Sequence, residues 1–492
     1  MLVADLLSAL KQRGFSPQLW PAQPALLDVE LAAACFDSRR VQSKDLFCAI
    51  DGEKFNGVDY VDSAVSNGAA LSLVQELQPD ITTPQIIVSD SLAEVAAHCS
   101  DILAASPSSD MWCAAVTGTN GKTTVAHLLR GALTDVAISA ASCGTLGMID
   151  ASGTSATLNT TPSADLIHNW LKSLQSTNCE SVVLEASSHG IVQQRLAAID
   201  FDCLAFTNLS REHLDYHKSM NNYAEAKTSL VHRLNASAVA FIPHDPLLLD
   251  LCSDASCTVQ SWSSCDTSAD HFCSIDADDK GVTVSFQWQQ QPLTIESELT
   301  GYHNGENIFL AALMMLSRGV AVEQVAVALA KQSSADGRLQ QVPIHRGTAY
   351  VDYAHTPDAL EKVLLSLRAS HPNARLKVVF GAGGDRDNSK RAPMGRAVSE
   401  YADWCVLTSD NPRSEDPRLI IDQVAAGIDV DSIEYQCVVD RAAAIRLAVE
   451  SMSDNDVLVV AGKGHETYQE INGTRTDFDD RVEIREASKC LA

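Results

Sequence analysis

Short apolar runs alternate with longer amphipathic stretches along much of the chain. In its last third, four such runs occupy residues 349–353, 377–380, 404–408 and 457–460, with helical patterns between them. Apolar runs of this length, bounded by polar residues, are typical of strands buried on both faces of a parallel sheet. The alternation therefore predicts the βα rhythm of a doubly wound sheet.

Three α/β domains are predicted, because 492 residues are too many for one hydrophobic core. The first covers residues 1–90. The second covers residues 91–337 and contains a mostly parallel sheet, and the third covers residues 338–492 with a Rossmann-like rhythm. Residues 252–281 are rich in Ser and Asp and have weak periodicity, so we expect a hairpin excursion from the middle domain.

The N-terminus is predicted to be an amphipathic helix whose apolar face carries Leu2, Val3, Leu6, Leu7 and Leu10. It lacks the basic start and the apolar centre of a signal peptide. No apolar run in the sequence approaches the length of a membrane span. We therefore expect a cytoplasmic protein without membrane insertion.

The charge balance restricts the classes of partner. A formal net charge of −27 and a pI near 4.8 argue against nucleic acid and against an acidic membrane surface. The fourteen cysteines include no C-x-x-C pair, and Cys252, Cys257, Cys265 and Cys273 are too unevenly spaced for a zinc site. We interpret them as reduced thiols.

Residues 112–124 carry the strongest chemical signal. A β-prone apolar run stops at Gly118 and a helical pattern follows the segment, which is the context of a phosphate-binding loop. Gly118 and Gly121 let backbone N–H groups approach phosphate oxygens, and the helix N-terminus adds positive potential. Val116 stands where the common motif has its first glycine, so an ordinary Gly-Lys turn is the alternative. The flanking pattern favours binding of ATP or a close relative.

Residues suited to phosphate and Mg²⁺ surround this loop. Lys122 can neutralise terminal phosphates, and the Thr123 hydroxyl can join a Mg²⁺ shell. Glu185 ends an apolar run, where nucleotide-binding sheets place an acid for Mg²⁺. His213 follows the next run; alone it is more often a surface histidine, but metal ligands converge at the carboxyl edge of parallel strands. Lys227, taken alone, is a solvated helix lysine.

Five motifs together resemble the Mur ligases, which make the peptide stem of bacterial peptidoglycan. These motifs are residues 117–124, 185–190, 208–215, 301–307 and 352–357. The resemblance runs from residue 37 to residue 466, nearly the whole chain. It implies a ligase that transfers the γ-phosphoryl group of ATP to a carboxylate, after which an amine attacks the acyl phosphate.

The resemblance also implies roles for the residues of the central domain, with Lys122, Glu185, His213 and Lys227 as its catalytic set. Thr123 and Glu185 would hold Mg²⁺ on the ATP phosphates, and Glu185 and His213 a second Mg²⁺. Lys227 falls on a lysine that the family carbamylates with CO₂, and N6-carboxylysine would supply a further metal ligand. The implied ATP-binding residues are Gly118, Thr119, Asn120, Gly121, Lys122, Thr123, Thr124, Asn304, Asn307 and Asp352.

The first domain is implied to bind UDP-N-acetylmuramoyl-L-alanyl-D-glutamate, together with residues of the second. Residues 52–55 read Gly-Glu-Lys-Phe and depart from the Gly-His loop usual in the family. Arg195 suits a substrate carboxylate, whereas Thr160 and Thr161 alone could form a turn before Pro162. The implied residues are Phe36, Ser38, Glu53, Lys54, Phe55, Asn159, Thr160, Thr161, Ser187, Gln193 and Arg195.

Three predicted strands of the last domain end in the polar loops 381–387, 410–413 and 461–466. Parallel strands would bring these loops together into a pocket with two guanidinium groups and several carboxyl or amide oxygens. Loop 410–413 reads Asp-Asn-Pro-Arg, which resembles the version used for meso-diaminopimelate; lysine-adding relatives usually lack this arginine. The alternative for Arg413 is a surface salt bridge. The implied residues are Arg386, Asp410, Asn411, Pro412, Arg413, Gly462 and Glu466.

Three other functions stay open at this point. An L-lysine-adding ligase, a folylpolyglutamate synthase-like ligase and a phosphate-loop ATPase switch would each use the same ATP site. A ligase needs both the nucleotide-linked peptide and an amino acid for phosphate release, whereas a switch needs neither. We expect a monomer.

Overall fold

The computed structural model describes residues 1–52 and 55–490, and the chain divides into two compact units. The first unit comprises Met1–Lys122, Leu133–Trp262 and Ser317–Gly319. The second comprises Thr123–Ala132, Ser263–Leu316 and Val320–Ala492. Each unit is α/β in class, as the apolar pattern predicts, whereas the domain borders at residues 90 and 337 remain predictions.

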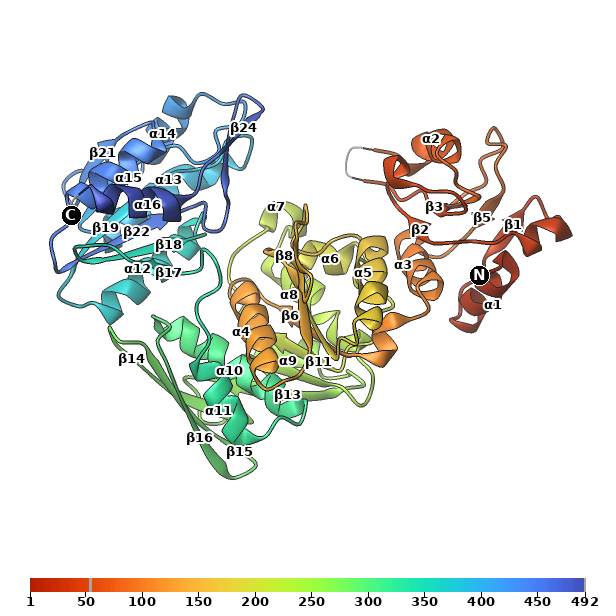
Figure 1. Cartoon of the computed structure of the whole chain (residues 1–492), viewed down its shortest axis with the longest axis horizontal. Helices are drawn as coiled ribbons and strands as arrows, with labels where there is room; N and C mark the ends of the chain where they lie inside the picture. The colour runs from red at the N-terminus through yellow and green to blue at the C-terminus, as the bar shows by residue number, and fades with distance from the viewer. Residues whose placement is uncertain (53–54, 491–492) are drawn as a thin grey trace. The chain divides into compact units, whose positions relative to one another are not determined.

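The first unit begins with a five-stranded sheet in the order β1-β5-β4-β3-β2, in which only β1 runs antiparallel to its neighbour. The amphipathic helix predicted at the N-terminus is confirmed as α1, which packs with α3 on one face, while α2 covers the other (Figure 1). Leu2 precedes this helix and is exposed, unlike the other four apolar residues of the predicted face. The elements are α1 (Val3–Gln12), β1 (Gln18–Trp20), β2 (Ala34–Cys35), β3 (Leu46–Cys48), α2 (Val61–Ser66), β4 (Leu71–Val74), β5 (Gln85–Ile87) and α3 (Leu92–Leu103).

A larger sheet follows in the order β13-β12-β11-β6-β10-β7-β8-β9, parallel as far as β7. The carboxyl ends of β11, β6 and β10 are adjacent, which brings the loops of three predicted motifs to one edge. Its strands are β6 (Trp112–Thr117), β7 (Ala140–Gly144), β8 (Gly147–Asp150), β9 (Gly153–Ser155), β10 (Ser181–Glu185), β11 (Cys203–Phe206), β12 (Val239–Pro243) and β13 (Thr258–Ser263). The helices are α4 (Lys122–Asp135), α5 (Ala164–Ser176), α6 (Ser188–Val192), α7 (Leu214–His217), α8 (Met220–Thr228) and α9 (Pro246–Leu251).

The hairpin excursion expected at residues 252–281 is present only in part: β14 (His271–Ala277) forms an antiparallel hairpin with β15 (Val282–Trp288), whereas the residues before it do not. Residues Thr258–Ser263 form β13, which pairs in parallel with β12. The buried Trp262 indole donates from Nε1 to Phe206 O at 3.0 Å, so a contact distant in sequence holds this polar segment to the sheet. Local composition carries no signal of such a contact.

The second unit contains an antiparallel meander and a six-stranded sheet. Strands β14, β15 and β16 pair antiparallel, and α11 packs on β16. A Cβ at Gly305 of α10 would lie 2.5 Å from Ile275 Cγ2, so this helix approaches β14 closely. The elements are β14 (His271–Ala277), β15 (Val282–Trp288), β16 (Gln291–Ser297), α10 (Tyr302–Ser317) and α11 (Val322–Ala330).

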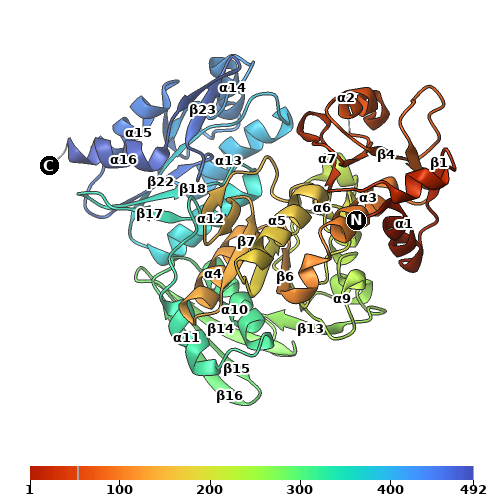
Figure 2. The same ribbon diagram turned by 45° about the vertical axis from the view of Figure 1, so that its right-hand side comes forward.

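The six-stranded sheet has the order β17-β18-β22-β19-β20-β21 and confirms the predicted βα rhythm, with only β17 antiparallel. Alternate residues of β22 enter different cores: Val457 and Val459 pack with residues of α12, α13 and α14, whereas Leu458 and Val460 pack with residues of α15 and α16. Figures 1 and 2 show these helices around the six-stranded sheet. The elements are β17 (Gln340–Val342), β18 (Thr348–Asp352), α12 (Pro357–Ser370), β19 (Arg375–Phe380), α13 (Arg391–Tyr401), β20 (Trp404–Leu407), α14 (Pro417–Ala425), β21 (Glu434–Cys437), α15 (Arg441–Glu450), β22 (Asp456–Ala461), β23 (Tyr468–Ile471), β24 (Thr474–Asp477) and α16 (Asp480–Lys489).

The helices within residues 1–52 and 55–490 are all too short or too polar to cross a membrane.

Candidate active site

The phosphate loop connects β6 to α4 and crosses the end of β11. Gly118 has φ +133°, and a Cβ there would lie 1.9 Å from Thr207 Oγ1, so a side chain is excluded on both conformational and steric grounds. Asn120 N donates to Asn208 Oδ1 at 3.0 Å, which ties the loop to the segment after β11. The structure therefore confirms the strand–loop–helix context of this motif.

Lys122 folds back over this loop. Its Nζ donates to Gly118 O at 2.8 Å and to Thr119 O at 2.9 Å. Thr119 Oγ1 accepts from Ser210 N at 3.0 Å and lies 3.3 Å from Tyr223 OH. The loop thus presents an ammonium group beside its backbone N–H groups, an arrangement suited to an anion.

Lys227 lies at the same loop and is not a solvated helix lysine. Its side chain is buried, its Nζ donates to Gly118 O at 2.7 Å, and it lies 4.7 Å from the centre of the Tyr223 ring. Burial, together with the charge of Lys122, lowers the pKa of the Lys227 amine well below its ordinary value. The reading as a solvated residue failed because α8 turns this face inward.

Glu185 ends β10 with its carboxylate buried. Its Oε1 accepts from Thr145 N at 2.9 Å, and its Oε2 accepts from Thr145 Oγ1 at 3.1 Å. A Cβ at Gly144 would lie 1.9 Å from Oε1, so glycine at the end of β7 makes room for the carboxylate. Thr145 and Gly144 have no motif of their own, and sequence reasoning did not identify them.

His213 precedes α7 with φ +54°, and its side chain is 44% exposed. Its ring centre lies 5.0 Å from that of His189 and its Nε2 lies 3.8 Å from Glu212 Oε2. Among the side chains that the structure describes, which do not include that of Asp215, three His, Cys, Asp or Glu residues nowhere converge as a metal-binding group. A Mg²⁺ shell built from Glu185, His213 and Lys227 therefore stays a prediction.

An arginine of the second unit that sequence reasoning missed contacts Thr123, a predicted ATP-binding residue. Arg338 Nη2 donates to Thr123 Oγ1 at 3.3 Å, and its guanidinium lies 4.8 Å from the Tyr353 ring centre. The preceding residue, Gly337, has φ +64°, and a Cβ there would lie 2.1 Å from Gly464 C. A Gly-Arg pair outside any motif was the only sequence signal.

The predicted nucleoside residues are buried and bonded within the protein. Asn304 Nδ2 donates to Thr300 O at 2.7 Å, and Asn307 Nδ2 donates to Asn304 Oδ1 at 3.1 Å. Asp352 accepts from Leu339 N at 2.6 Å and Ala354 N at 2.7 Å, while burial raises the pKa of its carboxyl. These contacts organise the local turns, and contact with ATP remains a prediction.

Several predicted peptide-binding residues lie together at the carboxyl end of β10. Thr161 Oγ1 donates to Glu185 O at 2.7 Å and lies 2.9 Å from Ser187 Oγ. Arg195 donates from Nη1 to Thr161 O at 2.7 Å and from Nη2 to Gln193 Oε1 at 2.6 Å. Thr160 Oγ1 lies 3.2 Å from Thr145 Oγ1, which connects this group to the Glu185 carboxylate.

The remaining residues of that set are more scattered. Phe36 packs against Ala97, Ala164 and Ala197. Ser38 is buried, whereas Phe55 and Asn159 are exposed. The predicted contacts Glu53 and Lys54 lie outside the described residues.

The residues predicted to bind the amino-acid substrate lie at the carboxyl edge of the six-stranded sheet. A Cβ at Gly383 would lie 3.2 Å from Arg413 Nη1, and Arg413 Nη1 donates to Gly384 O at 2.7 Å. Arg386 belongs to the same loop, with its Cγ 3.8 Å from that Cβ position. The structure therefore places the Arg413 guanidinium against the loop that carries Arg386.

Backbone contacts hold Arg413 in an unusual conformation. Its φ is +55°, its N–H donates to Glu470 O at 3.0 Å, and its carbonyl accepts from Asn472 N at 2.6 Å. A Cβ at Gly384 would lie 1.8 Å from Pro412 O, so the two loops pass in contact. Hydrogen bonds to β23 and the turn after it thus fix the backbone of Arg413. Sequence reasoning did not predict these contacts.

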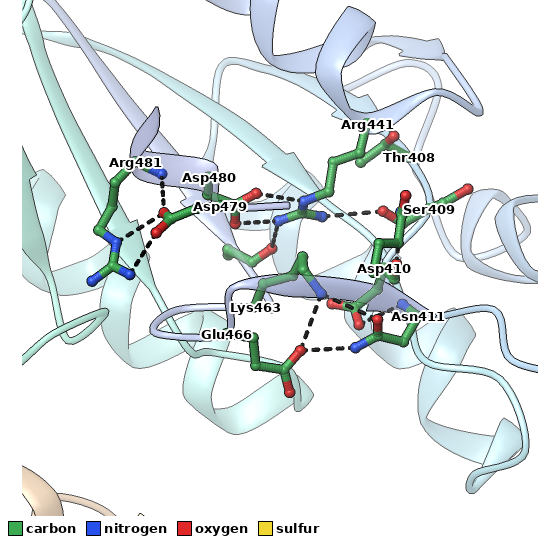
Figure 3. A network of polar contacts seen from close by, with 12 residues as sticks. Thr408, Ser409, Asp410, Asn411, Arg441, Lys463, Glu466, Asp479, Asp480 and Arg481 are labelled. Carbon is green, nitrogen blue, oxygen red and sulfur yellow. Dashed lines mark hydrogen bonds and ion pairs between the residues drawn. The ribbon is translucent and has the colours of Figure 1, made fainter. Parts of the chain in front are cut away.

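Oxygen-bearing side chains occupy the facing loop (Figure 3). Asn411 Nδ2 donates to Glu466 Oε2 at 2.8 Å. The buried Lys463 Nζ donates to the same Glu466 oxygen at 3.1 Å and to Asn411 Oδ1 at 3.2 Å. A Cβ at Gly462, whose φ is +113°, would lie 2.5 Å from Asp410 Oδ2, so a side chain there would displace this carboxylate. Together the loops offer both charge signs to a zwitterionic ligand.

Family models match three consecutive parts of the chain. They are the Mur ligase family, catalytic domain, at residues 33–110; the Mur ligase middle domain at residues 116–315; and the Mur ligase, glutamate ligase domain, at residues 337–464.

Curated relatives align over nearly the full length. A protein of Chlorobium phaeobacteroides, named UDP-N-acetylmuramoyl-L-alanyl-D-glutamate–2,6-diaminopimelate ligase, is 36% identical and covers 99% of this chain and 96% of its own. A protein of the same name from Haemophilus influenzae is 34% identical, covering 92% and 95%.

Solved structures agree in fold. A structure of UDP-N-acetylmuramoyl-L-alanyl-D-glutamate–2,6-diaminopimelate ligase has a TM-score of 0.67 at 33% identity and covers 96% of both chains. MurF ligase from Thermotoga maritima in complex with ADP has a TM-score of 0.63 at 17% identity, covering 89% of this chain and 95% of its own. Folylpolyglutamate synthase of Mycobacterium tuberculosis complexed with ADP has a TM-score of 0.60 at 18% identity, covering 74% and 90%. The last two comparisons concern the fold alone.

Proposed function

We propose, on the premise that this chain belongs to the Mur ligase family, that it is the member that joins meso-diaminopimelate to UDP-N-acetylmuramoyl-L-alanyl-D-glutamate. The chain is an ATP-dependent, amide-bond-forming ligase of peptidoglycan precursor synthesis. The observation that carries the choice of amino acid is the position of Arg413 and Arg386 beside Gly383, on the sheet edge that also carries Asp410, Asn411 and Glu466.

The proposed reaction has two steps with balanced bonds. The D-glutamate carboxylate attacks the γ-phosphorus of ATP, so that a new carboxyl O–P bond forms, the bond to the β-γ bridging oxygen breaks, and ADP leaves. The diaminopimelate amine then attacks the acyl carbon, forming the amide bond and expelling phosphate as the amine loses a proton. Both transition states concentrate negative charge.

Lys122 supplies positive charge for the first step. Its ammonium lies against the Gly118 and Thr119 carbonyls, beside N–H groups that can bind phosphate oxygens. Asn304, Asn307 and Asp352 are assigned to the nucleoside end of ATP by resemblance alone.

The acceptor peptide is assigned to the residues that lie together at the carboxyl end of β10. The Arg195 guanidinium is anchored on Thr161 O and Gln193 Oε1 by one terminal nitrogen each, and guanidinium groups bind carboxylates strongly and directionally. Ser187, Thr160 and Thr161 add hydroxyl groups at the same place.

Mg²⁺ and a carbamate complete the proposal, and the burial of the Lys227 amine supports the carbamate. Because its pKa is lowered, the buried Lys227 amine stays neutral at a lower pH than an ordinary lysine does. Only a neutral amine captures CO₂. Glu185, His213, the carbamylated Lys227 and Thr123 are the residues that would hold Mg²⁺, a cation that prefers oxygen ligands. When bound, Mg²⁺ neutralises charge on the transferring phosphoryl group.

Amino-acid selection is assigned to the six-stranded sheet. The distal carboxylate of diaminopimelate suits Arg413, while its amines suit the carboxylates of Asp410 and Glu466. L-Lysine lacks the distal carboxylate and would leave Arg413 unpaired. We further propose that the protein is a monomer and acts in the cytoplasm.

The test is ADP formation with a panel of amino acids in the presence of ATP, Mg²⁺ and UDP-N-acetylmuramoyl-L-alanyl-D-glutamate. We expect turnover with meso-diaminopimelate and little with L-lysine. Preference for L-lysine would contradict the choice of amino acid. Turnover without the nucleotide-linked peptide would indicate an ATPase switch, and a requirement for a folate in its place would indicate a folylpolyglutamate synthase.

A further inference from the structure

A fully buried ion pair lies beneath the loops assigned to the amino acid (Figure 3). Arg441 is the first residue of α15, and Asp480 is the first residue of α16. Arg441 Nε donates to Asp480 Oδ1 and Arg441 Nη2 to Asp480 Oδ2, both at 2.7 Å. This bidentate pairing fixes the plane of the guanidinium group.

The same guanidinium group holds two backbone carbonyls. Arg441 Nη1 donates to Ser409 O at 3.3 Å, and Nη2 donates to Ala461 O at 3.0 Å. Ser409 directly precedes Asp410, and Ala461 ends β22 directly before Gly462. Since β19 lies between β20 and β22 in the sheet, one side chain connects the carboxyl ends of two strands that are not neighbours.

The loops that follow β19, β20 and β22 pack closely against one another near this guanidinium. A Cβ at Gly381, which follows β19, would lie 2.1 Å from Thr408 O. A Cβ at Gly462 would lie 2.5 Å from Asp410 Oδ2. In packing this close, a shift of Ser409 or Ala461 passes directly to the Asp410 side chain.

We infer that Arg441 is a positioning residue that, with Asp480, sets the separation of loops 409–413 and 461–466 and so the affinity for diaminopimelate, without contacting it. The inference rests on the proposed function, because those loops are its amino-acid pocket. The guanidinium is suited to this role because its planar fork can donate to Asp480, Ser409 O and Ala461 O together. A lysine ammonium keeps the charge but loses this fixed geometry.

The same sheet provides a matched control. Lys377 Nζ lies 2.8 Å from Asp456 Oδ2, and both side chains are nearly fully buried. This pair connects β19 to β22 near their amino ends, at the edge opposite the pocket. It therefore shares the burial and charge of the Arg441–Asp480 pair without the proposed role.

The experiment compares Arg441→Lys, Arg441→Met, the double variant Arg441→Met/Asp480→Leu and the control Lys377→Met. For each we measure Tm, kcat, and KM for meso-diaminopimelate and for ATP. We expect the three Arg441 variants to raise KM for diaminopimelate by about tenfold to a hundredfold, because a misplacement of about 1 Å is this costly in a binding site. KM for ATP should stay within about twofold of wild type. Lys377→Met should lower Tm and leave KM for diaminopimelate within about twofold.

The double variant separates positioning from stability. Removing both charges relieves the cost of an unpaired buried aspartate, so its Tm should recover relative to Arg441→Met. Its KM for diaminopimelate should stay high, since the two carbonyls are still unheld. Recovery of KM together with Tm, or an equal rise of KM in Lys377→Met, would overturn the inference.

Two further arms keep the test decisive. If Arg441→Met does not fold, Arg441→Lys and the nearly isosteric Asp480→Asn carry the comparison, and an unchanged KM in both overturns the inference. Wild-type protein that fails to use diaminopimelate would contradict the proposed function itself. Wild-type turnover with unchanged Arg441 variants would contradict only the positioning role.

Discussion

At the scale of single residues, the carbonyl of Gly118 accepts hydrogen bonds from two lysines. Lys122 Nζ lies 2.8 Å away and Lys227 Nζ lies 2.7 Å away. Burial of Lys227, together with repulsion between these two neighbouring ammonium groups, lowers the pKa of the Lys227 amine. The loop therefore favours a neutral amine at Lys227.

Lys227→Ala should lower kcat by about a hundredfold or more if its carbamate contributes to charge stabilisation at the phosphate loop. A short carboxylic acid should restore part of the activity by filling the space, and removal of bicarbonate should slow the wild type. The measurements are initial rates with and without the additive, with the exposed Lys331→Ala as control. A fully active enzyme whose mass shows bare lysine under the assay conditions would contradict the carbamate.

The pH dependence of this effect has a defined sign. The folded-state pKa of Lys227 is lowered, so the neutral amine persists to lower pH than in the unfolded chain, and protonation is complete only below the folded pKa. At limiting bicarbonate, activity should therefore fall as pH decreases through that pKa and recover as pH rises.

Arg413→Ala should reduce kcat/KM for meso-diaminopimelate by roughly thirtyfold or more, because loss of one partner of a buried charge pair costs ~2–5 kcal/mol. The kcat/KM for L-lysine should rise only slightly, because the substitution removes the cost of an unpaired arginine but creates no new contact with lysine. Kinetics with both amino acids measure this change. Arg375→Ala, an exposed arginine on β19, serves as control and should leave both values unchanged. Unchanged diaminopimelate efficiency in Arg413→Ala would remove the basis for the assignment.

At the scale of elements, close crossings decide how the loops meet. Gly118 lets the phosphate loop pass the end of β11, and Gly384 lets loop 381–387 pass Pro412. At both places a Cβ would lie within 2 Å of an oxygen atom. The parallel strands bring loops to one edge, and these glycines set how closely the loops approach.

Gly118→Ala should raise KM for ATP by about tenfold or more, because the loop must move from Thr207 and its positive φ becomes strained at a cost of ~1–3 kcal/mol. Gly153→Ala is the matched control: its φ is +126°, but nothing lies within 4 Å of a Cβ there. Gly153→Ala should lower Tm because of the strained positive φ, and it should leave KM for ATP unchanged. Equal KM values in the two variants would contradict the steric argument.

At the scale of the whole molecule, charge is strongly unbalanced. The chain has 63 acidic and 36 basic residues, which gives a formal net charge of −27. Like charges repel over about 30 Å at 0.01 M salt but only about 10 Å at 0.1 M. The folded state, being more compact than the unfolded chain, bears more of this repulsion.

Raising NaCl from 0.01 M to 0.1 M should therefore increase Tm by about 1–3 °C at pH 7. Calorimetry without ligands measures the change. The increase should shrink near pH 5, close to the pI of about 4.8, where net charge approaches zero. A Tm that falls with salt at pH 7 would show that attractive pairs outweigh the general repulsion.

Much of this protein follows from its sequence. The spacing of apolar residues determined β6, β10, β11 and four strands of the last sheet, β18, β19, β20 and β22, because burial on both faces requires continuous apolar runs. It did not indicate β17 or the largely exposed β21. The motifs then indicated the phosphate loop and the loops proposed to bind diaminopimelate, since glycines and charged residues at strand ends are local features.

Contacts between distant residues were decided by the tertiary structure alone. Burial of Lys227, the bond from Arg338 to Thr123 and the Arg441 link from Ser409 to Ala461 all join segments without a shared local pattern. A side chain's burial and partners depend on which elements pack around it, and a sequence pattern reports only an element's own period. The candidate site residues could therefore be predicted from the sequence, whereas the residues that contact and hold them became visible only in the fold.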